Sequence, residues 1–311
     1  MKQVIFNVGG ALSVYSEFSG KKLLVDIGKS KDYNPITDFL LPLYERQRYT
    51  KSTTDSSKYY IDQLLISHPH NDHISAISDF RDAFFPELLT CPNDNDGMDD
   101  NHKVNWDLFD ENPNIDILKE MLVGRQPPLR ATHDQNEFIY YLPAKDVDGS
   151  DELSGESYCN NISIAVFLLI NHQRIFMPGD IQKMGMKELI DRNYYLKNKL
   201  AGGVDFLITP HHGLKSSFST VLFDNMRNKK TNRLNIVSEK SSGDDDNRTV
   251  DTRYSSSDYC LGNNNLSTRD SQCNQVKTSR GHILIDYSTY GRPKLEIISD
   301  KEILLEKFMQ I

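Results

Sequence analysis

A hexapeptide with three histidines and one aspartate, HPHNDH at residues 68–73, most constrains what this chain can fold into. It directly follows the apolar run QLLI at 63–66, which predicts a buried strand. One interpretation is a polar loop whose histidines only cap a helix beginning near Ile74. The other is a metal site, because histidine and aspartate are metal ligands and here they stand at ligand spacing. We therefore expect the end of this strand to bind metal.

The backbone geometry of this segment indicates which side chains can share an ion. Residues two apart on an extended chain face the same side, and Pro69 favours an extended conformation for the residue before it. His68 and His70 can therefore hold one metal ion together. Asp72 and His73 follow where the chain turns, so they can point to a neighbouring position and hold a second ion.

Two later strand ends carry the same kinds of side chain. RIFMPGD, residues 174–180, is a predicted strand followed by Pro-Gly and Asp180, although such a turn is ordinary on its own. VDFLITPHHG, residues 204–213, delivers His211 and His212 beside a glycine, and burying paired histidines is costly unless they bind something. Three strand ends with ligand-type residues predict one metal site at the edge of a sheet.

The composition favours one large domain in a reducing compartment. The 311 residues, 38% of them hydrophobic, predict a single domain over 1–311. No apolar run approaches the roughly 20 residues that cross a bilayer, and the start of the chain lacks a signal-peptide pattern, so we expect no membrane association and a cytoplasmic location. The four cysteines are widely spaced, which indicates neither a disulfide framework nor a paired-cysteine zinc site. The net charge of −8 opposes non-specific attraction to nucleic acid but is compatible with a local basic groove.

Apolar runs bounded by turn signals alternate with polar segments, which predicts an α/β layered protein. The expected strands are QVIFNV, LSVYSEF, KLLVDIG, QLLIS, SIAVFLLI, RIFMP, VDFLIT, LNIVS, HILIDY and KLEIIS. The expected helices are NPITDFLLPLYERQR, NIDILKEMLVG and MGMKELIDRNYYLKNKLAGG. Polar insertions near 91–114 and 241–275 are expected to be loops.

The order of these motifs resembles the metallo-β-lactamase superfamily, whose signature is His-x-His-x-Asp-His, a later histidine, a bridging aspartate and a final histidine. The resemblance extends from VIFNVGG and KLLVDIG through the three motifs to LNIVSEK, so it covers most of residues 3–240. It implies an αββα sandwich, in which two mixed β-sheets are faced by helices and metals lie at the edge between the sheets. It also implies that Asp26 supports the site.

The resemblance implies two divalent metal ions, Zn²⁺ or Mn²⁺, with Mg²⁺ as a further candidate. The residues implied to hold the first ion are His68, His70 and Asp180, with Asn161 as an added ligand. The residues implied to hold the second are Asp72, His73, Asp180 and one of His211 and His212. The proline of TPHHG favours His212 as the ligand and leaves His211 to face the substrate, but the opposite assignment stays open.

One histidine of the superfamily pattern is missing. In hydrolases such as glyoxalase II it precedes the strand before the bridging aspartate, and here Cys159, Asn160 and Asn161 take that place. An amide oxygen is a harder and weaker ligand than imidazole, so the first ion should bind more loosely and the site should tolerate Mn²⁺ or Mg²⁺. Cys159 and His133 are the alternative ligands for that ion. The remaining histidines are expected to be structural: His102, His172 and His282.

Two segments look like the hydrolase domain of ComEC-type competence proteins, which process DNA during uptake: YCNNISIAVFLLINHQRIFMPGD and ITPHHGLKSS. The chain lacks that family's multi-pass membrane part, and FNVGGALSV departs from its usual Gly-x-Gly-Asp. The resemblance implies a metal-dependent phosphodiesterase or nuclease that acts on DNA or another phosphodiester. Its catalytic residues would be Asp72, Asp180 and His211. Lys215, Ser216 and Ser217 follow the last motif and either contact a phosphate or form an ordinary polar loop.

Two other functions stay open. One is hydrolysis of a small ester, thioester, lactone, β-lactam or phosphoester, which the acidic net charge favours. The other is a non-catalytic module that keeps the metal for structure or partner recognition. The intact aspartates at 72 and 180 favour an enzyme over this module.

Overall fold

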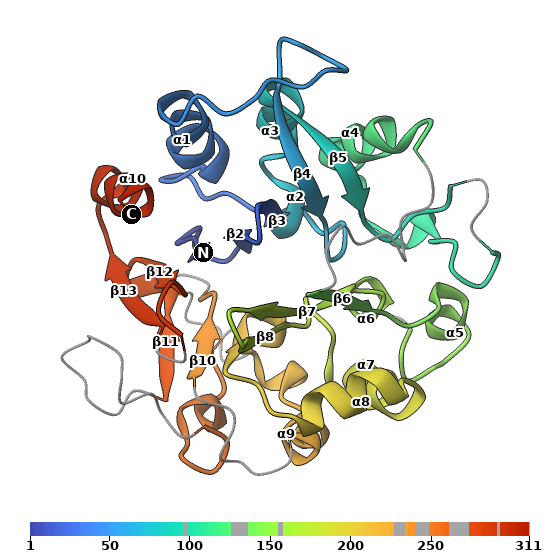
Figure 1. Cartoon of the computed structure of the whole chain (residues 1–311). Coiled ribbons are helices and arrows are strands. Elements are labelled where there is room, and N and C mark those ends of the chain that lie inside the picture. The colour runs from blue at the N-terminus through green and yellow to red at the C-terminus, as the bar shows by residue number, and fades with distance from the viewer. Residues whose placement is uncertain are drawn as a thin grey trace.

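The computed structural model describes residues 1–95, 99–125, 136–154, 158–226, 234–239, 249–260, 274–290 and 293–310. Two mixed β-sheets face each other at the centre of the molecule, and helices cover their outer faces (Figure 1). This arrangement confirms the predicted α/β fold with two mixed sheets and helices. The two predicted polar insertions lie partly outside the described residues.

The first sheet has seven strands in the order β13-β12-β1-β2-β3-β4-β5. Their bounds are β1 Lys2–Ile5, β2 Ser13–Phe18, β3 Lys21–Ile27, β4 Tyr59–Leu65, β5 Phe84–Thr90, β12 His282–Asp286 and β13 Lys294–Ile298. Strands β3, β4 and β5 run parallel, whereas the others pair antiparallel. The carboxyl ends of β3 and β4 therefore lie at one edge of this sheet.

The second sheet has six strands in the order β11-β10-β9-β8-β7-β6. Their bounds are β6 Glu137–Tyr140, β7 Ala165–Ile170, β8 Gln173–Met177, β9 Phe206–Ile208, β10 Leu234–Val237 and β11 Gln275–Lys277. Strands β8, β9, β10 and β11 run parallel, and β6 and β7 add antiparallel pairs. The loops after β8 and β9 thus leave the sheet on the same side.

Helices form the two outer layers (Figure 1). On the first sheet these are α1 (Leu41–Arg46), α3 (Ile77–Ala83), α4 (Pro113–Leu122) and α10 (Lys301–Met309), with the short π-helix η1 (Ile36–Leu40) before α1. On the second sheet they are α7 (Lys183–Arg192), α8 (Tyr194–Ala201) and α9 (Thr220–Asn225). The shorter helices are α2 (Asn71–Ile74), α5 (Ala144–Asp148) and α6 (Tyr158–Asn161).

Strand β7 shows why its sequence is a continuous apolar run. Val166 and Leu168 pack between the two sheets, whereas Ala165 and Phe167 pack against the outer helices of the second sheet. Successive side chains on a strand point to opposite faces, so a strand buried on both sides needs apolar residues throughout. This burial fixes the position of the segments that follow the central strands.

The ten predicted strands are all present, with bounds that differ by a few residues. The predicted long helix over 184–203 is wrong, because it is two helices that meet at Asn193. The backbone of Asn193 is extended and its side chain accepts a hydrogen bond from the Leu196 N–H, so it caps the start of α8. The unpredicted elements are strands β5, β6 and β11 and helices α3, α5, α6, α9 and α10.

Among the described residues, no helix combines the length and the apolar character that crossing a bilayer requires. The cysteines at 91, 159 and 260 are buried free thiols.

Candidate metal centre

The predicted ligands come together where the two sheets meet. His68 and His70 lie in the loop after β4, and Asp72 and His73 lie on α2 directly behind it. The second sheet contributes the loops after β8 and β9. The backbone of Ser67 joins the two sheets here, because its carbonyl accepts a hydrogen bond from the Ile164 N–H at 2.8 Å.

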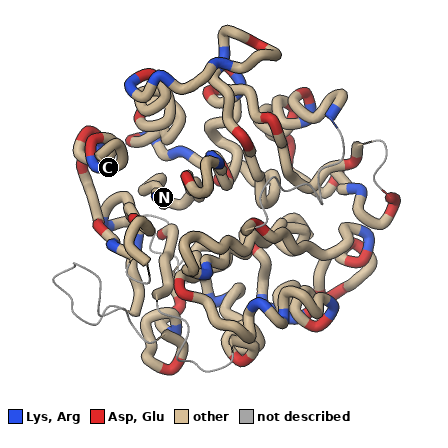
Figure 2. Tube along the Cα trace, viewed as in Figure 1, with Lys and Arg blue, Asp and Glu red and all other residues tan. Residues whose placement is uncertain are grey.

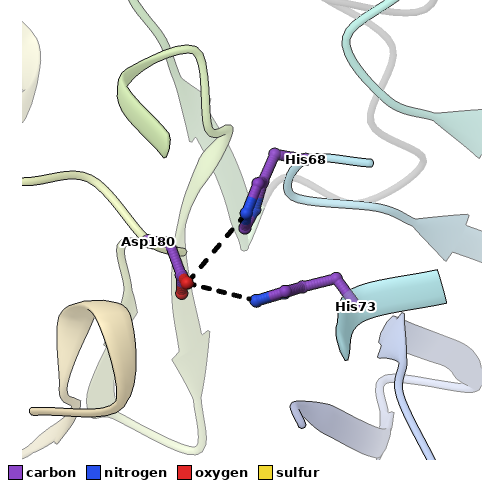
Figure 3. A group of neighbouring side chains, drawn as sticks. All are labelled: His68, His73 and Asp180. Carbon is purple, nitrogen blue, oxygen red and sulfur yellow. Dashed lines mark ion pairs between the residues drawn. The ribbon is translucent and has the colours of Figure 1, made fainter. Parts of the chain in front are cut away.

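Asp180 occupies the middle of the cluster. Its Oδ2 lies 3.3 Å from Nε2 of His73 and 3.6 Å from Nε2 of His212. The same oxygen lies 3.8 Å from Nε2 of His211 and 4.0 Å from Nε2 of His68. His68 and His73 point toward Asp180 from the opposite sheet (Figure 3). One carboxylate oxygen is therefore shared by four imidazoles.

Two overlapping groups have the geometry of metal ligands. His68, His73 and Asp180 place one ligand atom each within 4.8 Å of one another, and so do Asp72, His73 and His212. Nε2 of His73 and Nε2 of His212 are buried and have no hydrogen-bond partner among the described residues. Buried imidazole nitrogens without partners are costly, and imidazole and carboxylate suit divalent metal ions. The residues present therefore fit divalent metal ions.

His70 belongs to the same cluster through His68. Its Nδ1 lies 2.9 Å from Nε2 of His68, and the two rings meet edge to face. The prediction that His68 and His70 face the same side is confirmed, because the backbone at His70 is extended before α2 begins. The two nitrogens are therefore close enough to each other to be ligands of one ion.

Asp26 holds His73 from behind, at the end of β3. Its Oδ2 lies 2.8 Å from Nδ1 of His73, and its Oδ1 accepts a 2.7 Å hydrogen bond from the Ser67 N–H. The Ser67 hydroxyl donates to Oδ2 at 2.8 Å. A carboxylate on Nδ1 fixes the ring orientation and leaves Nε2 with its lone pair toward the centre. The supporting position that the resemblance implied for Asp26 agrees with these contacts.

The geometry favours His212 over His211 as the ligand. The Nε2 of His212 lies 3.4 Å from Asp72 and 3.6 Å from Asp180, and its Nδ1 lies 3.1 Å from the Ser238 carbonyl, which orients the ring. The side chain of His211 is 20% exposed, whereas that of His212 is 3% exposed. His211 therefore stands at the border between the cluster and solvent.

Both histidines have an unusual backbone. The φ angles are 46° at His211 and 55° at His212, in the left-handed region that residues other than glycine seldom adopt. Such conformations cost about 1 kcal/mol or more each and persist where function requires them. This backbone conformation turns two consecutive side chains toward Asp180. In a regular strand, consecutive side chains would point to opposite faces.

The pKa values reflect burial and mutual charge. Burial lowers the pKa of His68 well below its usual value. Burial also acts to lower the pKa of His73, but the carboxylates of Asp180 and Asp26 raise it well above the usual value. Although burial opposes it, the charges of His73 and His212 hold the pKa of Asp180 well below the usual range. The carboxylate is therefore kept ionised, as a metal ligand must be.

The contacts of Asn161 favour a structural role over the predicted role as a ligand. Its amide oxygen accepts a 3.0 Å hydrogen bond from the Gln182 N–H, and its amide nitrogen donates to the Leu153 carbonyl at 3.2 Å. A side chain added at Gly185 would come within 2.2 Å of this oxygen, so Asn161 is packed tightly against α7. Asn161 thus stabilises the start of α7, the helix that follows Asp180, by its hydrogen bond with Gln182. The buried Oδ1 of Asn160, by contrast, has no hydrogen-bond partner among the described residues.

Neither alternative ligand of the first metal ion gains support, and the predicted phosphate contacts differ in their accessibility. The thiol of Cys159 donates to the Leu108 carbonyl at 3.1 Å, and burial raises its pKa to about 11, so it is held as a neutral thiol. His133 lies outside the described residues. The hydroxyl of Ser217 donates to the Pro210 and Leu214 carbonyls and is not available to a phosphate. Lys215 and Ser216 are exposed beside the site, and the Ser216 hydroxyl lies 3.4 Å from Nδ1 of His211.

Sequence reasoning did not identify the groups that orient the histidines. Ser67 and the Ser238 carbonyl were missed, although each is the last residue of a predicted strand, QLLIS and LNIVS. The signal that could have found Ser67 is its position between a buried strand and the first histidine. His102 and His172 lie outside the cluster as predicted, and His102 pairs with Asp99. His282 lines a cavity that also contains Asp72.

The comparisons with known proteins identify the fold family. The model of the metallo-β-lactamase superfamily matches residues 58–221, which is more than half of the chain. A search of curated protein sequences finds no match. Neither comparison distinguishes subgroups, so the ComEC-type resemblance stays a prediction.

Solved structures with a similar fold are only distantly related. A metallo-β-lactamase candidate from Thermotoga maritima is 16% identical over 66% of this chain and 94% of that chain, with a TM-score of 0.36. CmlA, a diiron β-hydroxylase from Streptomyces venezuelae, is 14% identical over 67% of this chain and 34% of that chain, with a TM-score of 0.34. A diphosphatase from the PhnP family is 12% identical over 76% of this chain and 84% of that chain, with a TM-score of 0.33. The family assignment therefore rests on the sequence match.

Proposed function

Because the chain belongs to the metallo-β-lactamase superfamily of metal-dependent hydrolases, we propose that it is a phosphodiesterase, with DNA as the substrate class. Two divalent ions, Zn²⁺ or Mn²⁺ with Mg²⁺ as a further candidate, would be held by His68, His70, Asp72, His73, Asp180 and His212. Bound there, such ions supply an acidic water and neutralise charge on a phosphoryl group. The side chains of the protein would position the ions and the phosphoryl group, and they would transfer the protons of the reaction.

His211 is the observation that carries this proposal. Its Nε2 lies 3.8 Å from Asp180, and its side chain is partly exposed at the border of the cluster. The buried His212 would complete the ligand set. A histidine that is not required as a ligand can give a proton to the leaving group. The leaving group of a nucleic acid is an alkoxide, which needs that proton, whereas an activated ester does not. His211 is therefore proposed as the general acid, with Asp72 and Asp180 as the carboxylates that hold the ions.

The segments that resemble ComEC-type hydrolases also support a nucleic-acid substrate. The net charge of −8 is the main argument for a small substrate. Lys and Arg alternate with Asp and Glu over the outer helices, and neither sign dominates this view of the molecule (Figure 2). The acidic side chains are thus dispersed in this view, so the net negative charge is compatible with a local site that attracts a phosphate.

A panel of substrates tests the proposal. The reconstituted protein is assayed on supercoiled plasmid, on bis(4-nitrophenyl) phosphate and on a chromogenic carboxylic ester, with Mn²⁺, Mg²⁺ and Zn²⁺ in parallel. Cleavage of the two phosphodiesters but not of the ester is expected. Hydrolysis of the ester alone would contradict a phosphodiesterase, and no hydrolysis with bound metal would favour a binding module.

The role of His211 is tested with two leaving groups. His211→Ala should slow plasmid cleavage by on the order of a hundredfold, but bis(4-nitrophenyl) phosphate far less, because 4-nitrophenolate leaves without a proton. His212→Ala is the matched control at the neighbouring position, and it should slow both substrates and lower the metal content. Equal losses on both substrates in His211→Ala would exclude the general acid.

A further inference from the structure

A cavity of about 760 Å³ lies directly beside the metal centre. Asp72 forms part of its wall, and the opposite parts of the wall come from the loop after β1, the loop after β3 and the start of β12. A substrate bound at the metal ligands can therefore extend into this cavity.

His282 presents a hydrogen-bond donor to the cavity. The residue is only 3% exposed, and its Nδ1 accepts a 3.0 Å hydrogen bond from the Asn7 backbone N–H. Because Nδ1 is an acceptor, the neutral ring carries its proton on Nε2. Burial lowers the pKa of His282 to about 4, so the ring is neutral at pH 7. The hydrogen bond at Nδ1 is the one that the ring makes among the described residues, so Nε2–H is free to donate to a ligand.

The loop after β1 adds to the wall of the cavity residues whose backbone N–H groups are unpaired in the described part of the chain. Val8, Gly9 and Gly10 line the cavity, and their N–H groups have no acceptor among the described residues. Gly9 has a φ of 65°, a conformation that glycine adopts without strain. Successive free N–H groups in such a turn form a typical binding site for an anion.

Lysines add positive charge. Lys29, Lys31 and Lys301 line the cavity. Lys29 pairs with Asp79 and Lys301 with Asp38, whereas Lys31 is exposed and has no ion pair within the part of the chain that the structure describes. An ammonium group beside free N–H groups favours an oxyanion ligand.

Three carboxylates also line the cavity, those of Asp32, Asp72 and Glu239. Asp72 is one of the proposed metal ligands, where a bound ion would offset its charge, and the other two do not cancel the preference for an anion. Glu239 lies 2.6 Å from Lys277 and also accepts a hydrogen bond from Ser279, so its charge is already balanced. Asp32 is exposed at the rim. The donors without a partner therefore decide which ligand the cavity takes.

We propose that this cavity binds a second phosphate group of the substrate, next to the phosphodiester that reaches the metal ligands. The proposal rests on the proposed phosphodiesterase function. Its donors are Nε2–H of His282, the N–H groups of Val8, Gly9 and Gly10, and the ammonium of Lys31. The second phosphate is either the terminal phosphate of a short substrate or the neighbouring internal phosphate of a strand, since the two offer the same oxygens.

The test compares substrates with and without a second phosphate. The metal-loaded protein is assayed on dithymidine with one internucleotide phosphate, on the same dinucleotide with a terminal 5′-phosphate, and on trithymidine with two internal phosphates. The expected kcat/KM is at least about tenfold higher for whichever two-phosphate substrate fits, because one charge-assisted contact contributes that much. Equal kcat/KM for all three would overturn the proposal.

Variants assign the effect to the cavity. Lys31→Ala and His282→Asn should remove the preference, because Asn keeps an acceptor for the Asn7 N–H but lacks a donor at the ε position. His282→Gln, which keeps a donor at that position, should retain more of it. Lys145→Ala, an exposed lysine on α5, is the control and should behave as wild type. A preference that survives in both Lys31→Ala and His282→Asn would contradict the assignment.

A binding measurement separates this proposal from the proposed function. Pyrophosphate is titrated by calorimetry into metal-free protein, and binding that weakens about tenfold in Lys31→Ala is expected. If wild type cleaves no phosphodiester but binds pyrophosphate in this way, only the proposed function fails. If it cleaves phosphodiesters but binds no pyrophosphate and shows no preference, only the cavity proposal fails.

Discussion

His73 and Asp180 face each other across the two sheets, with Nε2 and Oδ2 3.3 Å apart. His73 follows β4 of the first sheet, whereas Asp180 follows β8 of the second, so the distance between them depends on how the sheets pack (Figure 3). The apolar layer between the sheets therefore positions the metal ligands.

Asp180→Asn should abolish hydrolysis and leave the fold intact. The carboxylate oxygen is within 4.0 Å of four imidazoles, and an amide in its place carries no charge for the ions. We expect phosphodiester turnover to fall by more than about a hundredfold, as losses of ligand-sphere residues commonly do. Turnover, circular dichroism and bound metal are measured together. Near-wild-type turnover with full metal content would show that Asp180 does not have this role.

Asp26→Asn should weaken metal binding without unfolding the protein. Asp26 has a φ of 56°, and asparagine tolerates this left-handed conformation, so the substitution mainly removes the charge that orients His73. Metal affinity should fall by about 10- to 100-fold. Competition with a chelator of known affinity measures it. Unchanged affinity would mean that Ser67 alone suffices to hold the ring.

Asn160 and Asn161 should respond differently to alanine. Asn161→Ala removes two buried hydrogen bonds, including one to the first turn of α7, and should lower the free energy of unfolding by about 1–3 kcal/mol at unchanged metal affinity. Asn160→Ala removes a buried oxygen that has no partner among the described residues, and it should weaken metal binding instead. Urea denaturation and calorimetric metal titration of both variants decide. The reverse pattern would restore Asn161 as the ligand.

Residues within one motif could be predicted from the sequence, whereas contacts between distant segments could not. The His68 to His73 motif and Asp180 follow from strand patterns and spacing, because each lies directly behind its own strand. The contacts of Asn161 disfavour its predicted role as a ligand, since its oxygen accepts a hydrogen bond from the N–H of Gln182, 21 residues later, directly before α7. His282 was taken as structural because no ligand-type residue stands near it in the sequence. Its partner is the backbone of Asn7, which only the pairing of β1 with β12 brings close.

The stability of the metal-free protein should depend on pH through His282. Burial lowers the pKa of this histidine to about 4 in the folded state, below the usual value of 6.5. Between these values the unfolded chain binds a proton that the folded protein does not, so stability is complete above about pH 6.5 and is lost as the pH falls toward 4. From pH 7 to 4.5, wild type should lose on the order of 2 kcal/mol more than His282→Asn. Urea denaturation with a chelator present measures this difference, and equal losses would place the pKa of His282 near its ordinary value.

The metal content of the purified chain tests the central claim most directly, namely that the side chains from the two sheets form one metal centre on which hydrolysis depends. After reconstitution and removal of free metal, elemental analysis should find up to two divalent ions per chain in wild type. An Asp72→Ala, Asp180→Ala double variant should retain almost none, because it removes a carboxylate from each group of ligands. Wild-type protein without bound transition metal, or a double variant with the same content, would contradict the account.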